Sequence, residues 1–156
     1  MLRMAALREV GFFPEGPADY GSEEKDLSLR LMDRGYEIMF LPGVYVWHER
    51  VPSGRSFAAQ HSSGVCNDMA WVLRRFPMPM VLWWLPAKAL GNVRFSLRHG
   101  LLMKAIQGFA RFTMAVPWLL RERRPVQRKT LLQFWGRARK FPGAMGAQFP
   151  LEAGEA

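Results

Sequence analysis

Residues 21–35 read GSEEKDLSLRLMDRG, and this stretch contains signals for the start and the end of a helix. Ser22 is a residue type that favours helix N-caps, and Gly35 is the type that most often ends a helix. Acidic side chains favour the first helical turn, where the helix dipole is positive. Three acids occupy that turn: Glu23, Glu24 and Asp26. The stretch therefore predicts a helix from about Ser22 to Arg34.

The three acids differ in the helix face that they share with later residues. Residues three, four and seven apart lie on one side of a helix, so Glu24 shares a face with Leu27 and Leu31. Those leucines must pack inward, which carries Glu24 to the edge of the core, where a cleft can open. Asp26 shares a face with Arg30, and we expect an i,i+4 ion pair between them. An alternative stays open, in which all three acids only satisfy the helix N-terminus.

Further elements are expected on the C-terminal side of this helix. Two short strands are predicted over residues 36–41 and 44–47, joined by a turn at Pro42 and Gly43. A helix is expected over residues 56–75, and two more over residues 94–120 and 127–140. Residues 78–90 between them are dense in Met, Trp, Leu and Pro. Their longest strongly apolar run, residues 78–85, is far shorter than the roughly 20 residues that cross a bilayer.

Charge is unevenly distributed along the sequence. Residues 1–75 carry 9 Lys and Arg against 10 Asp and Glu, whereas residues 76–156 carry 13 against 3, a net charge of +10. This asymmetry suggests that the second half meets an anionic partner, either a membrane surface or nucleic acid. The single cysteine, Cys66, allows neither a disulfide framework nor a thiolate metal cage within one chain. Residues 1–10 lack the continuous apolar run of a signal peptide, so no export signal is expected.

Several short motifs follow one another in a fixed order along residues 3–77. They are VGF at 10–12, YGSEEKDLSLRL at 20–31, DRGY at 33–36, FLP at 40–42, and WHE at 47–49 followed by Arg55. This order and spacing resemble the acceptor-side, C-terminal portion of family 2 (GT-A type) glycosyltransferases. The resemblance implies an α/β fold, namely a partial GT-A (nucleotide-diphospho-sugar transferase-like) fold with few strands, followed by a mainly α-helical, basic C-terminal part.

The resemblance also divides the chain. Residues 1–77 are expected to form the C-terminal subdomain of a GT-A glycosyltransferase. Residues 78–141 are expected to form an amphipathic helical extension, and residues 142–156 a disordered tail.

The activity implied by the resemblance is inverting transfer of a sugar from a nucleotide-sugar donor to a glycan or lipid-linked acceptor. In the family, the second acid of the pair usually deprotonates the acceptor hydroxyl as general base, and here this acid is Glu24. The family usually has Asp at this position, so the longer side chain shifts the carboxylate by one methylene group. Glu23 would orient its neighbour or bind an acceptor hydroxyl, and Asp26 completes the implied catalytic set. The remaining implied contacts are with acceptor or phosphate, from Trp47 and Arg55, and with a metal, from His48.

The family binds its nucleotide in a preceding α/β unit whose Asp-rich motif holds a divalent metal. The sequence matches no such unit and has no Asp-x-Asp motif. We therefore expect that the complete enzyme uses Mg²⁺ or Mn²⁺, and that this chain alone does not bind the metal tightly and is inactive. It would be a fragment, a split partner or a remnant, and an upstream catalytic half is an expected partner. The expected location is the cytoplasm, with peripheral contact on the inner face of the plasma membrane.

Two other functions stay open on the sequence. One is a non-catalytic membrane-surface or protein-interaction module that retains the transferase scaffold. Trp83, Trp84 and Trp118, with flanking arginines, would suit a helix lying in the lipid interface. The other is nucleic-acid binding by the basic half, which we do not expect, because Trp and Met cluster with Pro in an apolar run. His61, His99 and Cys66 have no partners at ligand spacing and are interpreted as structural.

Overall fold

The computed structural model describes residues 2–19, 21–39, 47 and 56–140, the last four of these by their backbone alone. Six helices follow one another in this part of the chain. They are α1 (Met4–Val10), α2 (Glu23–Asp33), α3 (Phe57–Arg75), α4 (Met78–Arg98), α5 (Leu102–Arg121) and α6 (Arg128–Lys140).

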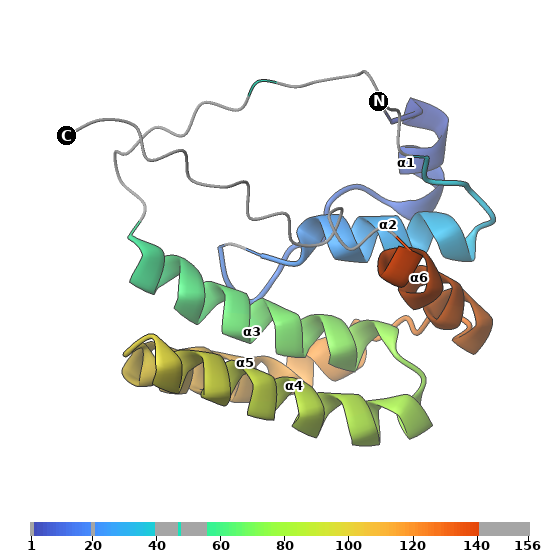
Figure 1. The fold of residues 1–156 in the computed structure, drawn as a ribbon. Coiled ribbons are helices and arrows are strands. Elements are labelled where there is room, and N and C mark those ends of the chain that lie inside the picture. The colour runs from blue at the N-terminus through green and yellow to red at the C-terminus, as the bar shows by residue number, and fades with distance from the viewer. Residues whose placement is uncertain (1, 20, 40–46, 48–55, 141–156) are drawn as a thin grey trace.

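Helix α3 forms the centre of the arrangement. It runs between α2 on one side and α4 and α5 on the other, and α6 lies beside α2 (Figure 1). Five helices contribute buried side chains to one core, among them Leu29, Val72, Val81, Phe112 and Leu131. This core therefore takes residues from both sides of the expected boundary at residue 77.

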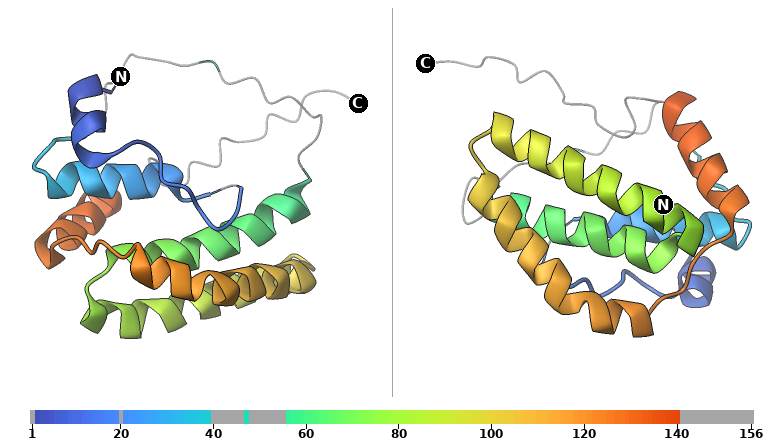
Figure 2. Two further views of the ribbon diagram at one scale, coloured as in Figure 1. Left: turned by 180° about the vertical axis from the view of Figure 1, so that it is seen from behind. Right: turned by 90° about the horizontal axis from the view of Figure 1, so that it is seen from below.

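Helices α3 and α5 cross at very short range, as the view from below shows (Figure 2). Gly108 of α5 lies at the crossing, where a Cβ atom would be 2.5 Å from the backbone oxygen of Ser62 and 2.8 Å from Cβ of Val65. Contacts this close between a carbon and a backbone atom do not occur. Only glycine therefore lets α5 approach α3 closely enough to seal the core.

The prediction of an α/β, partial GT-A fold is wrong: the described residues form helices and no strand. Residues 36–39, expected to begin the first strand, form neither helix nor strand. An alternating sequence becomes a strand only where a neighbouring strand accepts its backbone hydrogen bonds, and none of the described segments offers one. The expected second strand, residues 44–47, lies outside the described residues except for Trp47.

Several helix predictions are confirmed. The stretches expected over residues 22–34, 56–75 and 127–140 correspond to α2, α3 and α6. The single helix expected over residues 94–120 is instead divided at Gly100, whose φ of +67° reverses the chain between α4 and α5. Helix α4 also begins earlier than expected, at Met78. Pro79 lies in its first turn, where the missing N–H has no intrahelical acceptor, and Pro86 lies inside the helix.

Helix α2 is held at its C-terminal end by its neighbours. Asp33 accepts hydrogen bonds from the backbone N–H of Gln127, at 2.9 Å, and from the hydroxyl of Thr130, at 2.7 Å, which joins α2 to the start of α6. The hydroxyl of Tyr36 donates to Glu9 of α1 at 2.5 Å.

No helix in the described part of the chain combines the length and apolar character that crossing a membrane requires.

Candidate functional site at the start of helix α2

The backbone turns into α2 through two consecutive residues with positive φ. Gly21 has φ +105° and Ser22 has φ +72°. The left-handed conformation costs a residue with a Cβ roughly 1–2 kcal/mol, so Ser22 is strained. Its side chain makes no N-cap hydrogen bond, contrary to the role expected for it, and its hydroxyl instead donates to Asp68 of α3 at 2.7 Å. Strain of this kind persists only where surrounding contacts impose it.

Asp26 holds the start of α2 against α3. Its carboxylate accepts from Nε of Arg30 at 2.6 Å, as the i,i+4 prediction expects, and from Nε and Nη2 of Arg75 at 2.5 and 3.1 Å. The side chains of Asp26 and Arg75 are each only 5% exposed. Arg30 extends the network, because its guanidinium also donates to the carbonyl oxygens of residues 10–12. Both oxygens of Asp26 are therefore engaged in a buried structural cluster.

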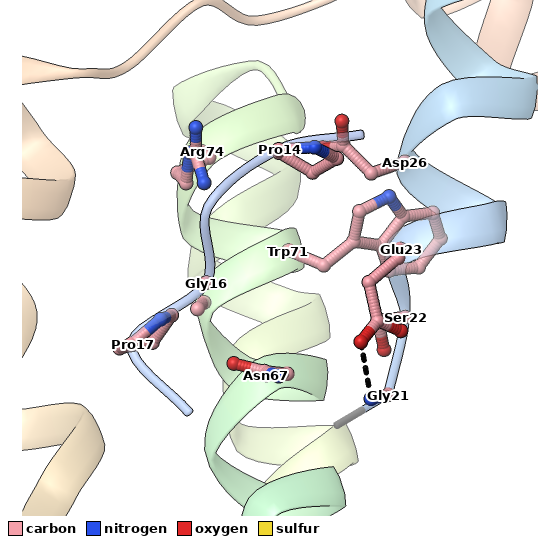
Figure 3. Close-up of a pocket in the computed structure, with 11 residues that line it drawn as sticks. Pro14, Gly16, Pro17, Gly21, Ser22, Glu23, Asp26, Asn67, Trp71 and Arg74 are labelled. Atoms are coloured by element: carbon pink, nitrogen blue, oxygen red, sulfur yellow. Dashed lines mark hydrogen bonds between the residues drawn. The ribbon is translucent and has the colours of Figure 1, made fainter. Parts of the chain in front are cut away.

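The other two acids of the first turn are placed differently. Glu23 bends back, and its Oε1 accepts from the backbone N–H of Gly21 at 2.9 Å (Figure 3). Glu24 is exposed and makes no hydrogen bond or ion pair with any residue that the structure describes. The three acids thus divide into a buried ion pair, a local cap and an accessible carboxylate.

A small hollow lies on one side of Ser22, between the 14–17 loop, α2 and α3 (Figure 3). Its volume is about 30 Å³, which is room for an ordered water and too small for a sugar. Two buried donors beside it have no partner among the described residues, namely Nε1 of Trp71 and Nε of Arg74. A water there would satisfy such groups, so this hollow is interpreted as structural.

A larger hollow, of about 360 Å³, lies on the other side of Ser22 between the α2 start, α3 and α4. Asp68 of α3 lies in its wall and binds three donors: the Ser22 hydroxyl, Nζ of Lys25 at 3.2 Å and Nζ of Lys88 at 3.0 Å. Burial alone would raise the pKa of Asp68. The two lysines and the hydroxyl outweigh burial and hold that pKa below its usual value. Asp68 therefore stays ionised and ties α2 to both α3 and α4.

The residues singled out in the sequence are only partly brought together. Glu23, Glu24 and Asp26 share the first turn of α2, and Trp47 is 93% exposed. His48 and Arg55, expected as metal ligand and phosphate contact, lie outside the described residues. Within the described ranges, His, Cys, Asp and Glu side chains form no group of three that would hold a metal ion. Cys66 is fully buried, and burial raises the pKa of its thiol to about 11, which makes it inert.

Two residues of the larger hollow were not predicted from the sequence. Asp68 and His61 are single polar residues on an otherwise mixed helix, and no local spacing marks them. Their role depends on α2 and α4 approaching α3 from opposite sides.

A comparison of the chain with protein-family models, curated proteins and solved structures finds no match.

Proposed function

We propose that this chain acts in glycosyl transfer, as the acceptor-side part of a glycosyltransferase, with Glu24 as the general base. The observation that carries the proposal is the division of the three acids at the α2 start. A general base must have an oxygen free to take a proton. Both oxygens of Asp26 are held by guanidinium groups and one oxygen of Glu23 by a backbone N–H, whereas neither oxygen of the exposed Glu24 is engaged by a described residue.

The chemistry is a single displacement with inversion. The acceptor hydroxyl oxygen forms a bond to the anomeric carbon of the donor sugar, while the bond from that carbon to the nucleoside diphosphate breaks. The hydroxyl proton passes to the carboxylate of Glu24, and the leaving group departs as the nucleoside diphosphate. Choice of this reaction rests on the motif order along residues 3–77, and the geometry supports the role of Glu24 within it.

The surroundings of Glu24 suit a base that must keep its position. The first turn of α2 is tied to α3 at two points, through Asp26 with Arg75 and through Ser22 with Asp68. Both ties involve charged groups that are largely shielded from water, where such hydrogen bonds are strong. A helix start fixed in this way presents the next side chain along it in a constant direction.

A transfer assay tests the proposal. The chain is supplied alone, and together with the product of the adjacent upstream coding region, and transfer from sugar nucleotides to glycan and lipid-linked acceptors is measured. Glu24→Gln removes the base with little change in shape and should abolish transfer, whereas Glu24→Asp keeps a carboxylate and should retain it. No transfer in either preparation, or full activity in Glu24→Gln, would contradict the proposal.

A second candidate function, docking on an anionic lipid surface, is favoured by the surface of α4 and α5. Residues 78–121 contain no Asp or Glu, and their cations are Lys88, Arg94, Arg98, Lys104, Arg111 and Arg121. Large apolar side chains lie exposed on both helices, with Trp83 81% exposed and Met114 78% exposed. Apolar residues combined with cations suit a helix that lies in a negatively charged lipid interface.

The structure also shows which of the tryptophans are free to contact a lipid surface. Trp84 is half-buried and stacks on Trp135 of α6, with 4.1 Å between the ring centroids, and Trp118 packs under the guanidinium group of Arg74. Trp83 is therefore the tryptophan of choice for a test. Sedimentation with vesicles containing phosphatidylglycerol should pellet the chain, vesicles of phosphatidylcholine alone should not, and Trp83→Ala should weaken pelleting. Equal pelleting with both vesicles would exclude an electrostatic surface role.

A further inference from the structure

We propose that the larger hollow between the α2 start, α3 and α4 is a binding subsite for a neutral sugar. This inference deepens the proposed function and rests on it for the choice of a sugar among hydroxylated ligands. The hollow, of about 360 Å³, is within the lower range of small-molecule pockets and matches a ligand of one or two sugar rings.

The charges in the wall of the hollow favour an uncharged ligand. Lys25 and Asp68 line the hollow and form an ion pair with each other, and Lys88, outside the lining, also directs its ammonium group to Asp68. An anion would meet the carboxylate of Asp68, and a cation would meet the ammonium group of Lys25. A neutral ligand escapes both costs and can still accept from the N–H groups that Lys25 retains.

His61 lines the same hollow, and a neutral imidazole ring carries one nitrogen that can accept a hydrogen bond. Its Nε2 lies 2.7 Å from the hydroxyl of Ser96, and that hydroxyl donates its single hydrogen to the carbonyl oxygen of Asn92 at 2.6 Å. Nε2 must therefore be the donor, which leaves Nδ1 as the acceptor of a neutral ring. Burial, and next the charge of His99, lower the pKa of His61, so the ring is neutral at pH 7.

Polar and aromatic groups around the hollow complete the features that sugars require. Asn92 lines the hollow, and its Nδ2 is buried without a partner among the described residues. The amide of Gln60 lies in the wall, and Phe57 and Phe95 line the hollow with partly exposed rings. Donors, acceptors and aromatic surface in one concavity match a ring that has hydroxyls at its edge and C–H groups on its faces.

Gly64 of α3 offers a way to block the hollow without disturbing the fold. It lines the hollow, and a Cβ atom added there meets nothing within 4 Å. Gly64→Leu therefore fills the hollow, and replacing a helical glycine favours the helix. Gly136→Leu on α6 is the matched control, because an added Cβ there also meets nothing within 4 Å and Gly136 does not line the hollow.

The test is an NMR titration of the ¹⁵N-labelled full chain. The probes are methyl glucoside, methyl galactoside and N-acetylglucosamine, with glucose 1-phosphate as the anionic counterpart. We expect saturable shifts of the Gln60, His61 and Asn92 resonances with at least one neutral sugar, lost in Gly64→Leu and retained in Gly136→Leu. Saturation only with glucose 1-phosphate, shifts that survive Gly64→Leu, or no saturable shift at these residues would overturn the inference.

The outcome separates this inference from the proposed function. Sugar binding in the hollow without any transfer activity would refute Glu24 as a base and leave the subsite in place. Transfer activity that is unchanged in Gly64→Leu would refute the subsite and leave the role of Glu24 in place.

Discussion

Replacing Asp26 by alanine should cost this protein a large part of its stability. The substitution removes three charge-assisted hydrogen bonds, one from Arg30 and two from Arg75. Hydrogen bonds to charged groups contribute about 1.5–3 kcal/mol each, but part of this loss is recovered. The Arg30 side chain is 12% exposed and can meet water, whereas that of Arg75 is 5% exposed and keeps only a bond to the carbonyl of Arg124.

The net loss expected for one buried charge left without its partner is about 3–5 kcal/mol. Total stabilities of small domains are about 5–15 kcal/mol, so Asp26→Ala should leave the chain close to unfolding. In urea, with a slope of about 2 kcal/mol per molar, the midpoint should fall by roughly 1.5–2.5 M.

The assay is urea denaturation followed by far-ultraviolet circular dichroism, with Glu24→Ala as the matched control. Glu24 lies in the same helical turn but is exposed, so its loss removes only a helix-dipole contact of less than about 1 kcal/mol. The double variant Asp26→Ala with Arg75→Met should cost less than the two single changes together, because no unpaired charge then remains. If Asp26→Ala cost no more than Glu24→Ala, the assignment of Asp26 to a structural cluster would be refuted.

Three further predictions concern the core and the acid response. Gly108→Ala should destabilise by about 1–3 kcal/mol in the same urea assay, because its Cβ meets the backbone of Ser62; Gly91→Ala, with open space around it, should be neutral or stabilising. The pKa of Asp68 is lower in the folded than in the unfolded chain, so its contribution to stability is complete above the ordinary carboxyl pKa. That contribution should be lost as the pH falls through the folded value, and Asp68→Asn should remove this part of the pH dependence. Cys66, with its pKa raised to about 11, should resist iodoacetamide at pH 8 and react fully in urea; rapid labelling of the folded chain would show that its burial is incorrect.

The sequence predicted what depends on residues close along the chain. The acids, Leu27 and Gly35 define α2 and its ends, and the spacing of Asp26 and Arg30 predicts their ion pair, which the structure confirms. Helical periodicity carries this information because helix hydrogen bonds and i,i+4 contacts are local.

The features that were not predicted arise from distant contacts. Asp26 and Arg75 are 49 residues apart, and no local pattern marks their pairing. The hollow beside Asp68 exists only because α2 and α4 approach α3 from different sides. Residues 36–39 were predicted to begin a strand that the structure does not form. Their pattern suits a strand, but a strand needs a partner to form. The start of α4 was not predicted, because Pro79 and Pro86 are of a residue type that disfavours helix interiors. Pro79 nevertheless suits an initial helical turn.

The proposed function depends most on the different roles of the three acids at the α2 start. The most direct measurement is the initial rate of sugar transfer at saturating acceptor for Glu24→Gln, Glu23→Gln and the unaltered chain, each paired with the same upstream gene product. We expect Glu24→Gln to abolish the rate, while Glu23→Gln, whose amide oxygen can still accept from the Gly21 N–H, retains most of it. Loss of activity in Glu23→Gln with retention in Glu24→Gln would contradict the assignment.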